Sequence, residues 1–179
     1  MPNGGGGVAA SREHAANDFF AEVYSLRRMK GTAMTRLKVL FLCTGNSCRS
    51  QMAEGWARHL KSDSIEPYSA GVEPHGMNQL AIHVMSEAGV DISRQYSKHV
   101  DVLKDLRFDY VVTVCNDAHE ACPLFSGKTK VVHVGFDDPP RLAKTSRNEA
   151  EALGYYRRVC DEIRDFVETL PGGLEKAGG

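Results

Sequence analysis

The 179 residues include 22 Lys and Arg against 23 Asp and Glu, and the formal net charge of −1 gives no reason to expect nucleic acid as a partner. A hydrophobic content of 42% is typical of a globular chain with one substantial core, and no apolar run approaches the roughly 18 residues that a membrane span needs. Because the glycine-rich start lacks the pattern of a signal peptide, we expect a cytoplasmic, reducing compartment in which the five cysteines are thiols, available for catalysis or metal binding.

Residues 1–34 differ from the rest of the chain. Glycines are followed by one stretch of amphipathic character, with no strand pattern. We interpret this part as an N-terminal extension, flexible or not native to the domain. Residues 35–171 form the predicted domain, and residues 172–179 are expected to be a flexible tail.

From residue 36 onward, apolar strand patterns alternate with helical ones. The predicted strands cover residues 37–42, 65–71, 109–114 and 130–134, and the predicted helices cover residues 50–61, 77–88 and 146–170. This alternation predicts an α/β fold with a four-stranded parallel sheet flanked by helices on both faces. In such a sheet the active site lies beyond the carboxyl ends of the strands.

The first predicted strand runs directly into Cys43, and Arg49 follows where the first predicted helix begins. This Cys-x5-Arg spacing lets the intervening backbone N–H groups turn inward around one tetrahedral oxyanion, assisted by the helix dipole. Gly45 is expected to let the chain curl with a positive φ angle, which Asn46 also tolerates. The predicted oxyanion-binding residues are Thr44, Gly45, Asn46, Ser47, Cys48 and Arg49.

The chemistry of this loop favours a nucleophilic cysteine. Its positive potential would lower the pKa of Cys43, whose thiolate could attack the central atom of the bound anion. Arg49 offers a planar fork to two oxygens of the anion, and Ser50 could donate a hydrogen bond to the thiolate. The alternative is a buried cysteine beside an incidental arginine. Cys48 is either a packing residue or a back-up thiol that forms a protective disulfide with Cys43.

The loop resembles those of two related families, the low-molecular-weight protein tyrosine phosphatases and the thioredoxin-coupled arsenate reductases. The phosphatases usually carry proline after the Arg-Ser pair, whereas Gln51 stands here, as in the reductases. Both resemblances imply the low-molecular-weight tyrosine phosphatase-like fold.

Two further cysteines bear on the choice between these families. Cys115 follows the third predicted strand, on the same edge of the sheet as Cys43, and Cys122 stands seven residues later, although two of five cysteines could also lie close in sequence by chance. The resemblance to the reductases covers residues 37–170. It implies that Cys43 attacks arsenate, that Cys115 attacks Cys43 and releases arsenite, and that Cys122 attacks Cys115. The resulting Cys115–Cys122 disulfide would be reduced by thioredoxin.

Supporting residues are also implied by the resemblance. An Asp-Pro turn follows the fourth predicted strand, and both families have an Asp-Pro there, so Asp138 would be the general acid that protonates the leaving oxygen, with Asp137 as its substitute. Ser69 would support the loop by hydrogen bonding through Asn46 or nearby backbone.

Some reductases of this family bind potassium behind the loop through Asn, Glu, Ser and Asp. Asn46, Glu54 and Ser69 match three of these positions, but Lys98 stands at the fourth, where its ammonium group could replace the cation. That departure argues against a potassium requirement, and we expect no tightly bound cofactor.

The sequence therefore predicts a monomeric enzyme that reduces arsenate to arsenite with thioredoxin as reductant. Phosphate or sulfate would compete as oxyanions, and weak phosphatase activity would remain. The first alternative is a low-molecular-weight protein tyrosine phosphatase. The second is a non-catalytic regulator that binds an oxyanion or zinc, since Cys115, His119, Cys122 and His133 could hold zinc at an irregular spacing.

Overall fold

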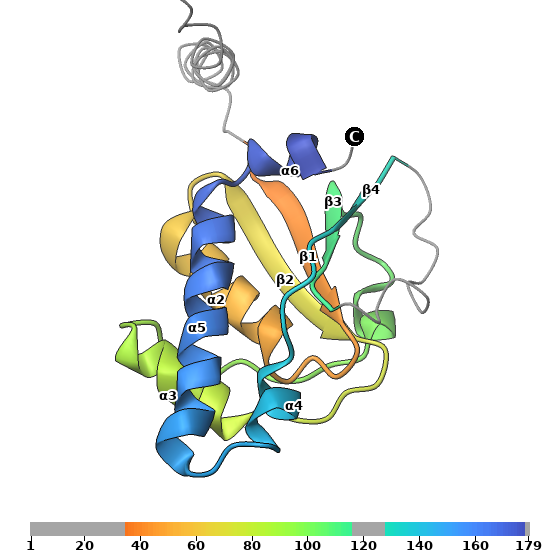
Figure 1. Ribbon diagram of the computed structural model, residues 1–179. Helices are drawn as coiled ribbons and strands as arrows, with labels where there is room; N and C mark the ends of the chain where they lie inside the picture. The colour runs from red at the N-terminus through yellow and green to blue at the C-terminus, as the bar shows by residue number, and fades with distance from the viewer. Residues whose placement is uncertain (1–34, 116–127, 178–179) are drawn as a thin grey trace, which may run out of the picture. The chain divides into compact units, whose positions relative to one another are not determined.

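The computed structural model describes residues 35–115 and 128–177, and the compact unit begins at Arg36. Four parallel strands form one sheet in the order β2-β1-β3-β4 (Figure 1). The strands are β1 (Leu37–Cys43), β2 (Ile65–Gly71), β3 (Tyr110–Thr113) and β4 (Lys130–His133). The prediction of a four-stranded parallel sheet is confirmed.

The described helices follow the alternation expected from the sequence. They are α2 (Arg49–Leu60), α3 (Gln79–Glu87), the 3₁₀-helix η1 (Val100–Leu103), α4 (Pro139–Ala143), α5 (Glu149–Glu168) and α6 (Gly173–Ala177). The three predicted helices correspond to α2, α3 and α5. The sequence patterns did not indicate η1, α4 and α6, which have five residues or fewer and are therefore too short to show a helical period.

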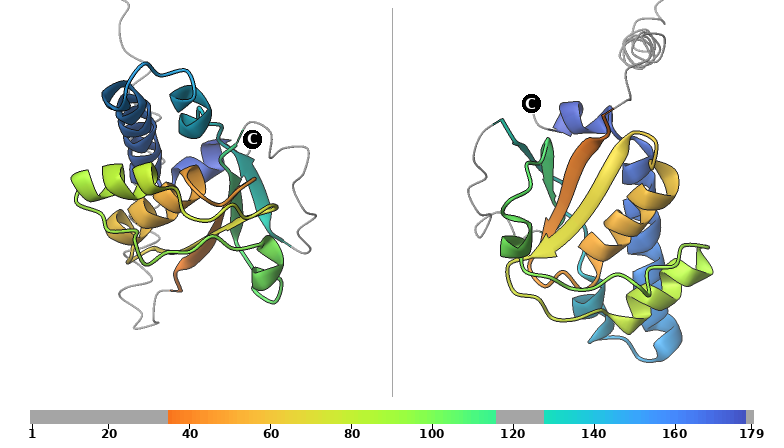
Figure 2. Two further views of the ribbon diagram at one scale, coloured as in Figure 1. Left: turned by 90° about the horizontal axis from the view of Figure 1, so that it is seen from below. Right: turned by 180° about the vertical axis from the view of Figure 1, so that it is seen from behind.

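Strand β1 is the centre of the core because its side chains are buried on both faces. Val39 and Phe41 pack with α2 and α5, whereas Leu40 and Leu42 pack on the other face. Successive side chains of a strand point to opposite faces, so one apolar run supplies both layers. Figure 2 shows α2 and α5 on one face of the sheet and η1 on the other, so helices cover both faces, as predicted.

The sheet places two cysteines at the same edge. Cys43 ends β1 beside Gly71 at the end of β2. Strand β3 pairs with β1 on the other side, and the N–H of Val114 donates to the carbonyl of Leu42 at 2.9 Å. Cys115 therefore emerges next to Cys43 at the carboxyl ends of neighbouring strands.

The end of the chain differs from the flexible tail expected for residues 172–179. Helix α6 lies within this range, and its Leu174 is buried in the core. Burial of a leucine side chain contributes about 2 kcal/mol in favour of this packed conformation. The expected N-terminal extension, residues 1–34, lies outside the described residues. Within residues 35–115 and 128–177, no helix is long and apolar enough to cross a membrane.

Candidate active site

The nucleophile loop, residues 43–49, joins the carboxyl end of β1 to the first turn of α2. The carbonyl oxygens of residues 44–47 all accept hydrogen bonds from outside the loop. The donors are Glu73 N to Thr44 O (2.9 Å), His75 N to Gly45 O (2.9 Å), Gln51 Nε2 to Asn46 O (2.9 Å) and Asn78 N to Ser47 O (3.0 Å). Because the C=O and N–H of a trans peptide point in opposite directions, the N–H groups of residues 45–48 are turned inward. This is the arrangement expected of an oxyanion cradle.

The residue with the left-handed backbone is Asn46, with φ of 45°. Gly45 does not have a positive φ, so the expectation for that residue is wrong. Gly45 instead leaves room for the His75 ring to pack against the loop, because an added Cβ would lie 2.7 Å from Nδ1 of His75. Gly71 serves the loop in the same way, since a Cβ there would lie 2.5 Å from the carbonyl oxygen of Thr44.

The sulfur of Cys43 is buried and surrounded by hydrogen-bond donors. The N–H of Asn46 donates to Sγ at 3.1 Å, and Oγ of Ser50 lies 2.9 Å away. The pKa of Cys43 is lowered to about 6, above all by a hydrogen bond from the Cys115 thiol and then by Ser50 and Asn46, against burial, which raises it. At neutral pH, Cys43 is therefore mostly a thiolate.

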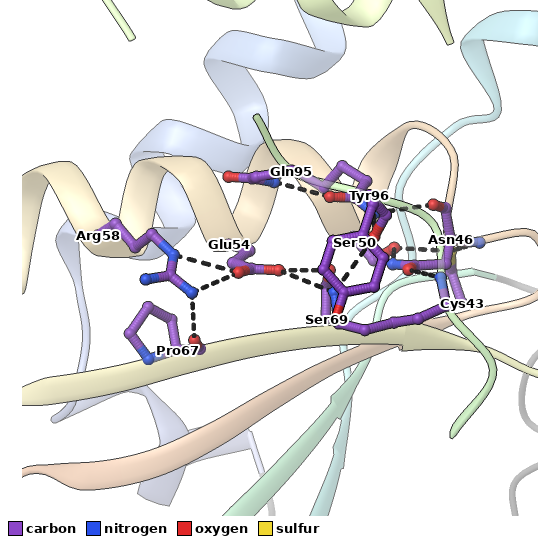
Figure 3. Close-up of polar contacts among 11 residues, drawn as sticks. Cys43, Asn46, Ser50, Glu54, Arg58, Pro67, Ser69, Gln95 and Tyr96 are labelled. Carbon is purple, nitrogen blue, oxygen red and sulfur yellow. Dashed lines mark hydrogen bonds and ion pairs between the residues drawn. The ribbon is translucent and has the colours of Figure 1, made fainter. Parts of the chain in front are cut away.

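The backbone of Lys98 fixes which group donates in the hydrogen bond between Ser50 and Cys43. The backbone N–H of Lys98 donates to Oδ1 of Asn46 at 2.9 Å, and Nδ2 of Asn46 donates to Oγ of Ser50 at 2.9 Å. Since a backbone N–H can only donate, Asn46 must present its NH₂ group to Ser50. The Ser50 hydroxyl is then free to donate its proton to Cys43 (Figure 3).

Cys115 has the opposite protonation behaviour. Its pKa is raised, first by the hydrogen bond to Cys43 and then by burial, whereas the charge of Arg49 and the N–H of Thr44 lower it. The two sulfurs thus hold one proton between them. That proton lies on Cys115, and Cys43 is ionised.

The two remaining described cysteines are not activated. Burial raises the pKa of Cys48, so its thiol stays protonated, which fits a packing residue. Cys160 is buried in the core with its sulfur 3.4 Å from Sδ of Met85.

Arg49 connects the loop to the turn after β4. Its Nη1 donates to the carbonyl oxygen of Phe136 at 2.9 Å, and its Nη2 lies 3.1 Å from Oδ1 of Asp138. Asp137 points to α5, where Arg158 donates to it at 2.8 Å. The structure therefore places Asp138, and not its neighbour, beside the nucleophile loop.

A buried carboxylate, Glu54, lies behind the loop on α2. It accepts hydrogen bonds from Arg58, the shorter at 2.7 Å, and from the hydroxyl of Ser69, and Nζ of Lys98 lies 3.9 Å away (Figure 3). Ser69 was expected to support the loop through Asn46 or nearby backbone. Its hydroxyl instead donates to Glu54, because the side chain at this position of β2 faces α2. Burial lowers the pKa of Lys98, although the charge of Glu54 opposes this.

A segment that we call the strap, residues 95–98, supports the loop and was not predicted as a unit. Ser97 Oγ donates to the carbonyl of Gly45 at 3.0 Å, and Gln51 joins the strap to Asn46. The sequence offered one signal, the polar Gln51 in the first turn of the helix, but it gave no partner for this side chain.

Cys122 and His119 lie outside the described residues, so the structure does not test the second half of the cysteine relay or the full zinc alternative. Among residues 35–115 and 128–177, no three His, Cys, Asp or Glu side chains are arranged to hold a metal ion. His133 Nδ1 lies 2.7 Å from Oγ1 of Thr113.

The ionisation of Cys43 can be measured by its alkylation. Iodoacetamide modification, followed by mass spectrometry of the Cys43 peptide, should rise with pH around a midpoint of about 6, because the thiolate is the reactive form. Cys115→Ala removes the strongest donor and should shift the midpoint upward. Cys160→Ala is the control and should leave it unchanged; an unchanged midpoint in Cys115→Ala would contradict the proton sharing.

The close contact at Gly45 predicts a second result. Gly45→Ala should weaken phosphate binding, measured by calorimetry, roughly tenfold or more, because the new methyl group collides with His75. The double variant Gly45→Ala/His75→Ala should recover most of the affinity. Gly154→Ala, where nothing lies within 4 Å of the added Cβ, is the matched control. If the double variant bound no better than Gly45→Ala, the contact would not be the cause.

Comparisons with known proteins agree with this geometry. A family model for low molecular weight phosphotyrosine protein phosphatases matches residues 38–178. An arsenate reductase from Shouchella clausii is 48% identical over 142 residues, which cover 76% of this chain and 99% of that protein. A solved arsenate reductase from Archaeoglobus fulgidus is 30% identical with a TM-score of 0.57, over 74% of this chain and 97% of that one. A solved thioredoxin-dependent arsenate reductase from Corynebacterium glutamicum is 25% identical with a TM-score of 0.55, over 90% of this chain and 75% of that one. The chain therefore belongs to the low molecular weight phosphotyrosine protein phosphatase family, in the branch that contains proteins named arsenate reductases.

Proposed function

We propose that the protein reduces arsenate to arsenite, with Cys43, Cys115 and Cys122 as a thiol relay and thioredoxin as the reductant. The observation that carries the proposal is the second thiol beside the nucleophile loop: Cys115, just after β3, donates a hydrogen bond to the Cys43 thiolate. A second thiol at this place has a direct chemical use in a reduction and none in a hydrolysis. The names of the relatives support the same reaction.

The first step is attack of the Cys43 thiolate on the arsenic of hydrogen arsenate. The inward N–H groups of the nucleophile loop and the Arg49 guanidinium hold the oxyanion. One arsenate oxygen accepts a proton from the carboxylic acid form of Asp138 and leaves as water, while the S–As bond forms. Arg49 is tied to Asp138 in this structure, so its turn toward the anion would free Asp138 for this role.

The second step reduces the arsenic. Formation of the S–As bond consumes the Cys43 thiolate, which is the group that most strongly holds the proton on Cys115. Cys115 can then pass its proton to an oxygen of the departing arsenite and attack the sulfur of Cys43. The electron pair of the S–As bond stays on arsenic, so As(V) becomes As(III), arsenite leaves, and a Cys43–Cys115 disulfide forms.

The third step regenerates Cys43. The thiolate of Cys122 attacks the sulfur of Cys115, expels Cys43 as a thiolate and forms the Cys115–Cys122 disulfide. Thioredoxin supplies the two electrons that return this disulfide to two thiols. The three steps together account for the two electrons that arsenate takes up.

The anion loop, Arg49 and Asp138 would also serve hydrolysis of a phosphate ester, so weak phosphatase activity is part of the proposal. A phosphatase as the main function is the second candidate, because the family model itself describes phosphatases. In that case Cys115 would not be needed for turnover.

The relay can be tested by arsenate-dependent NADPH consumption with thioredoxin and thioredoxin reductase. The parent protein should turn over, and Cys43→Ser, Cys115→Ser and Cys122→Ser should each abolish multiple turnover because each breaks the electron path. Cys160→Ala is the control and should keep the parental rate. Normal turnover by Cys122→Ser would refute the three-cysteine relay. Aryl phosphate hydrolysis that needs Cys43 alone, without arsenate turnover, would establish the phosphatase alternative.

We also propose that the enzyme needs no potassium, because the ammonium group of Lys98 already faces Glu54 at 3.9 Å. Exchanging K⁺ for Na⁺ at constant ionic strength should leave kcat and KM unchanged. Lys98→Met should lower kcat/KM roughly fivefold, since loss of a buried charged partner costs about 1 kcal/mol. Lys98→Arg is the charge-conserving control. Severalfold activation of the parent protein by K⁺ over Na⁺ would contradict this proposal.

A further inference from the structure

Gln51 is a buried polar residue that the mechanism above does not use. It follows Ser50 in the first turn of α2, and none of its surface is exposed to solvent. A buried amide is unfavourable unless its donors and acceptor are bonded. Every polar group of this side chain is bonded: Nε2 donates to the carbonyls of Asn46 (2.9 Å) and Tyr96 (3.0 Å), and Oε1 accepts from Nε2 of Gln95 (2.7 Å).

An amide side chain at residue 51 matches these partners. The carbonyl of Asn46 accepts its bond from Gln51 Nε2. The Tyr96 carbonyl also accepts from Nζ of Lys98 (3.2 Å), and Nε2 of Gln95 also donates to the backbone carbonyl of Gln51 (3.0 Å). A glutamate at residue 51 would place a carboxylate oxygen against two carbonyl oxygens. A methionine would fill a similar volume with no donor. The environment of Gln51 therefore favours an amide of this length.

The bond to Asn46 is the one that matters for the nucleophile. Asn46 has a left-handed backbone, which is unfavourable for a residue with a side chain and must be held by its surroundings. The same residue donates its N–H to the sulfur of Cys43 at 3.1 Å and its Nδ2 to Oγ of Ser50 at 2.9 Å. Its carbonyl also sets the direction of the Ser47 N–H, since the two share one peptide plane.

Asn46 differs from its neighbours in how its carbonyl is held. The carbonyls of Thr44, Gly45 and Ser47 accept bonds from backbone N–H groups, which nearly any residue supplies. The Asn46 carbonyl accepts its bond from a side chain. The shape of the loop at this point therefore depends on the identity of residue 51.

We propose that Gln51 is a positioning residue of the active site: by joining Asn46 to the strap, it keeps the donors of Asn46 and Ser50 aimed at Cys43 and the N–H of Ser47 aimed at the oxyanion. The proposal rests on the role of Cys43 as the nucleophile in the proposed function. The proposal also gives a chemical role to Gln51, which stands where the phosphatases usually carry proline.

The test compares Gln51→Met and Gln51→Glu with the parent protein in three measurements. These are the pH profile of Cys43 alkylation, the dissociation constant for inorganic phosphate, and unfolding followed by the fluorescence of the single tryptophan, Trp56. Both variants should raise the alkylation midpoint by about half a pH unit or more. Phosphate binding should weaken roughly tenfold. Ile163→Val, a core substitution in α5, is the control: it should lower stability without moving the midpoint or the phosphate affinity.

The result that would overturn the proposal is a parental midpoint and phosphate affinity in Gln51→Met, whatever its stability. If Gln51→Met does not fold, Gln95→Met removes the donor to Oε1 and to the backbone carbonyl of Gln51 but leaves the bond from Gln51 to Asn46. It should shift both quantities in the same direction by a smaller amount, and no shift would then overturn the proposal. Neither measurement needs arsenate turnover. A parent protein that fails to reduce arsenate but shows these shifts in its Gln51 variants would refute the proposed function and leave the positioning role intact.

Discussion

The rest of the site depends on one constraint, a negatively charged sulfur that is kept out of water. A buried thiolate is unfavourable by itself because it loses its hydration, and Cys43 is stabilised by donors that the fold brings to it from the loop, from α2 and from β3. These donors are useful only if the loop cannot relax. The outward hydrogen bonds of its carbonyls therefore hold the inward N–H groups in place, and the glycines at residues 45 and 71 let the neighbouring segments come close enough to make those bonds.

The partnership of Cys43 and Cys115 adds an order of events to this geometry. While Cys43 is ionised, Cys115 is its strongest donor and keeps its own proton. In the proposed reaction, the second thiol is thus held protonated by the group that it would later attack. A covalent bond at Cys43 would remove the larger cause of the raised Cys115 pKa, its hydrogen bond to the thiolate, and leave the effect of burial.

The turn after β4 and the network around Glu54 show how the nucleophile loop is joined to the rest of the domain. Arg49 reaches the turn after β4 through Phe136 and Asp138, so the predicted anion-binding arginine and the candidate acid are in contact. On the opposite side, Glu54 is held between Arg58, Ser69 and Lys98, and the backbone of Lys98 fixes Asn46. The loop is thereby supported by β2, α2 and the strap together.

The sequence by itself determined the parallel sheet, its main helices and the positions of Cys43, Arg49, Ser50 and Cys115, because apolar periodicity and the carboxyl ends of strands are local properties. Only the tertiary structure decided which groups meet. Gly45 was expected to have a positive φ, but the strained residue is Asn46, and Gly45 is needed because His75 packs against it. Ser69 turned toward Glu54, and Gln51 joined the strap, because hydrogen-bond partners 15 and 45 residues apart are chosen by packing and leave no periodic signal in the chain. Leu174 lies in the core for the same reason: a single buried side chain beyond the last long helix is recognised only when the surface that it covers is known.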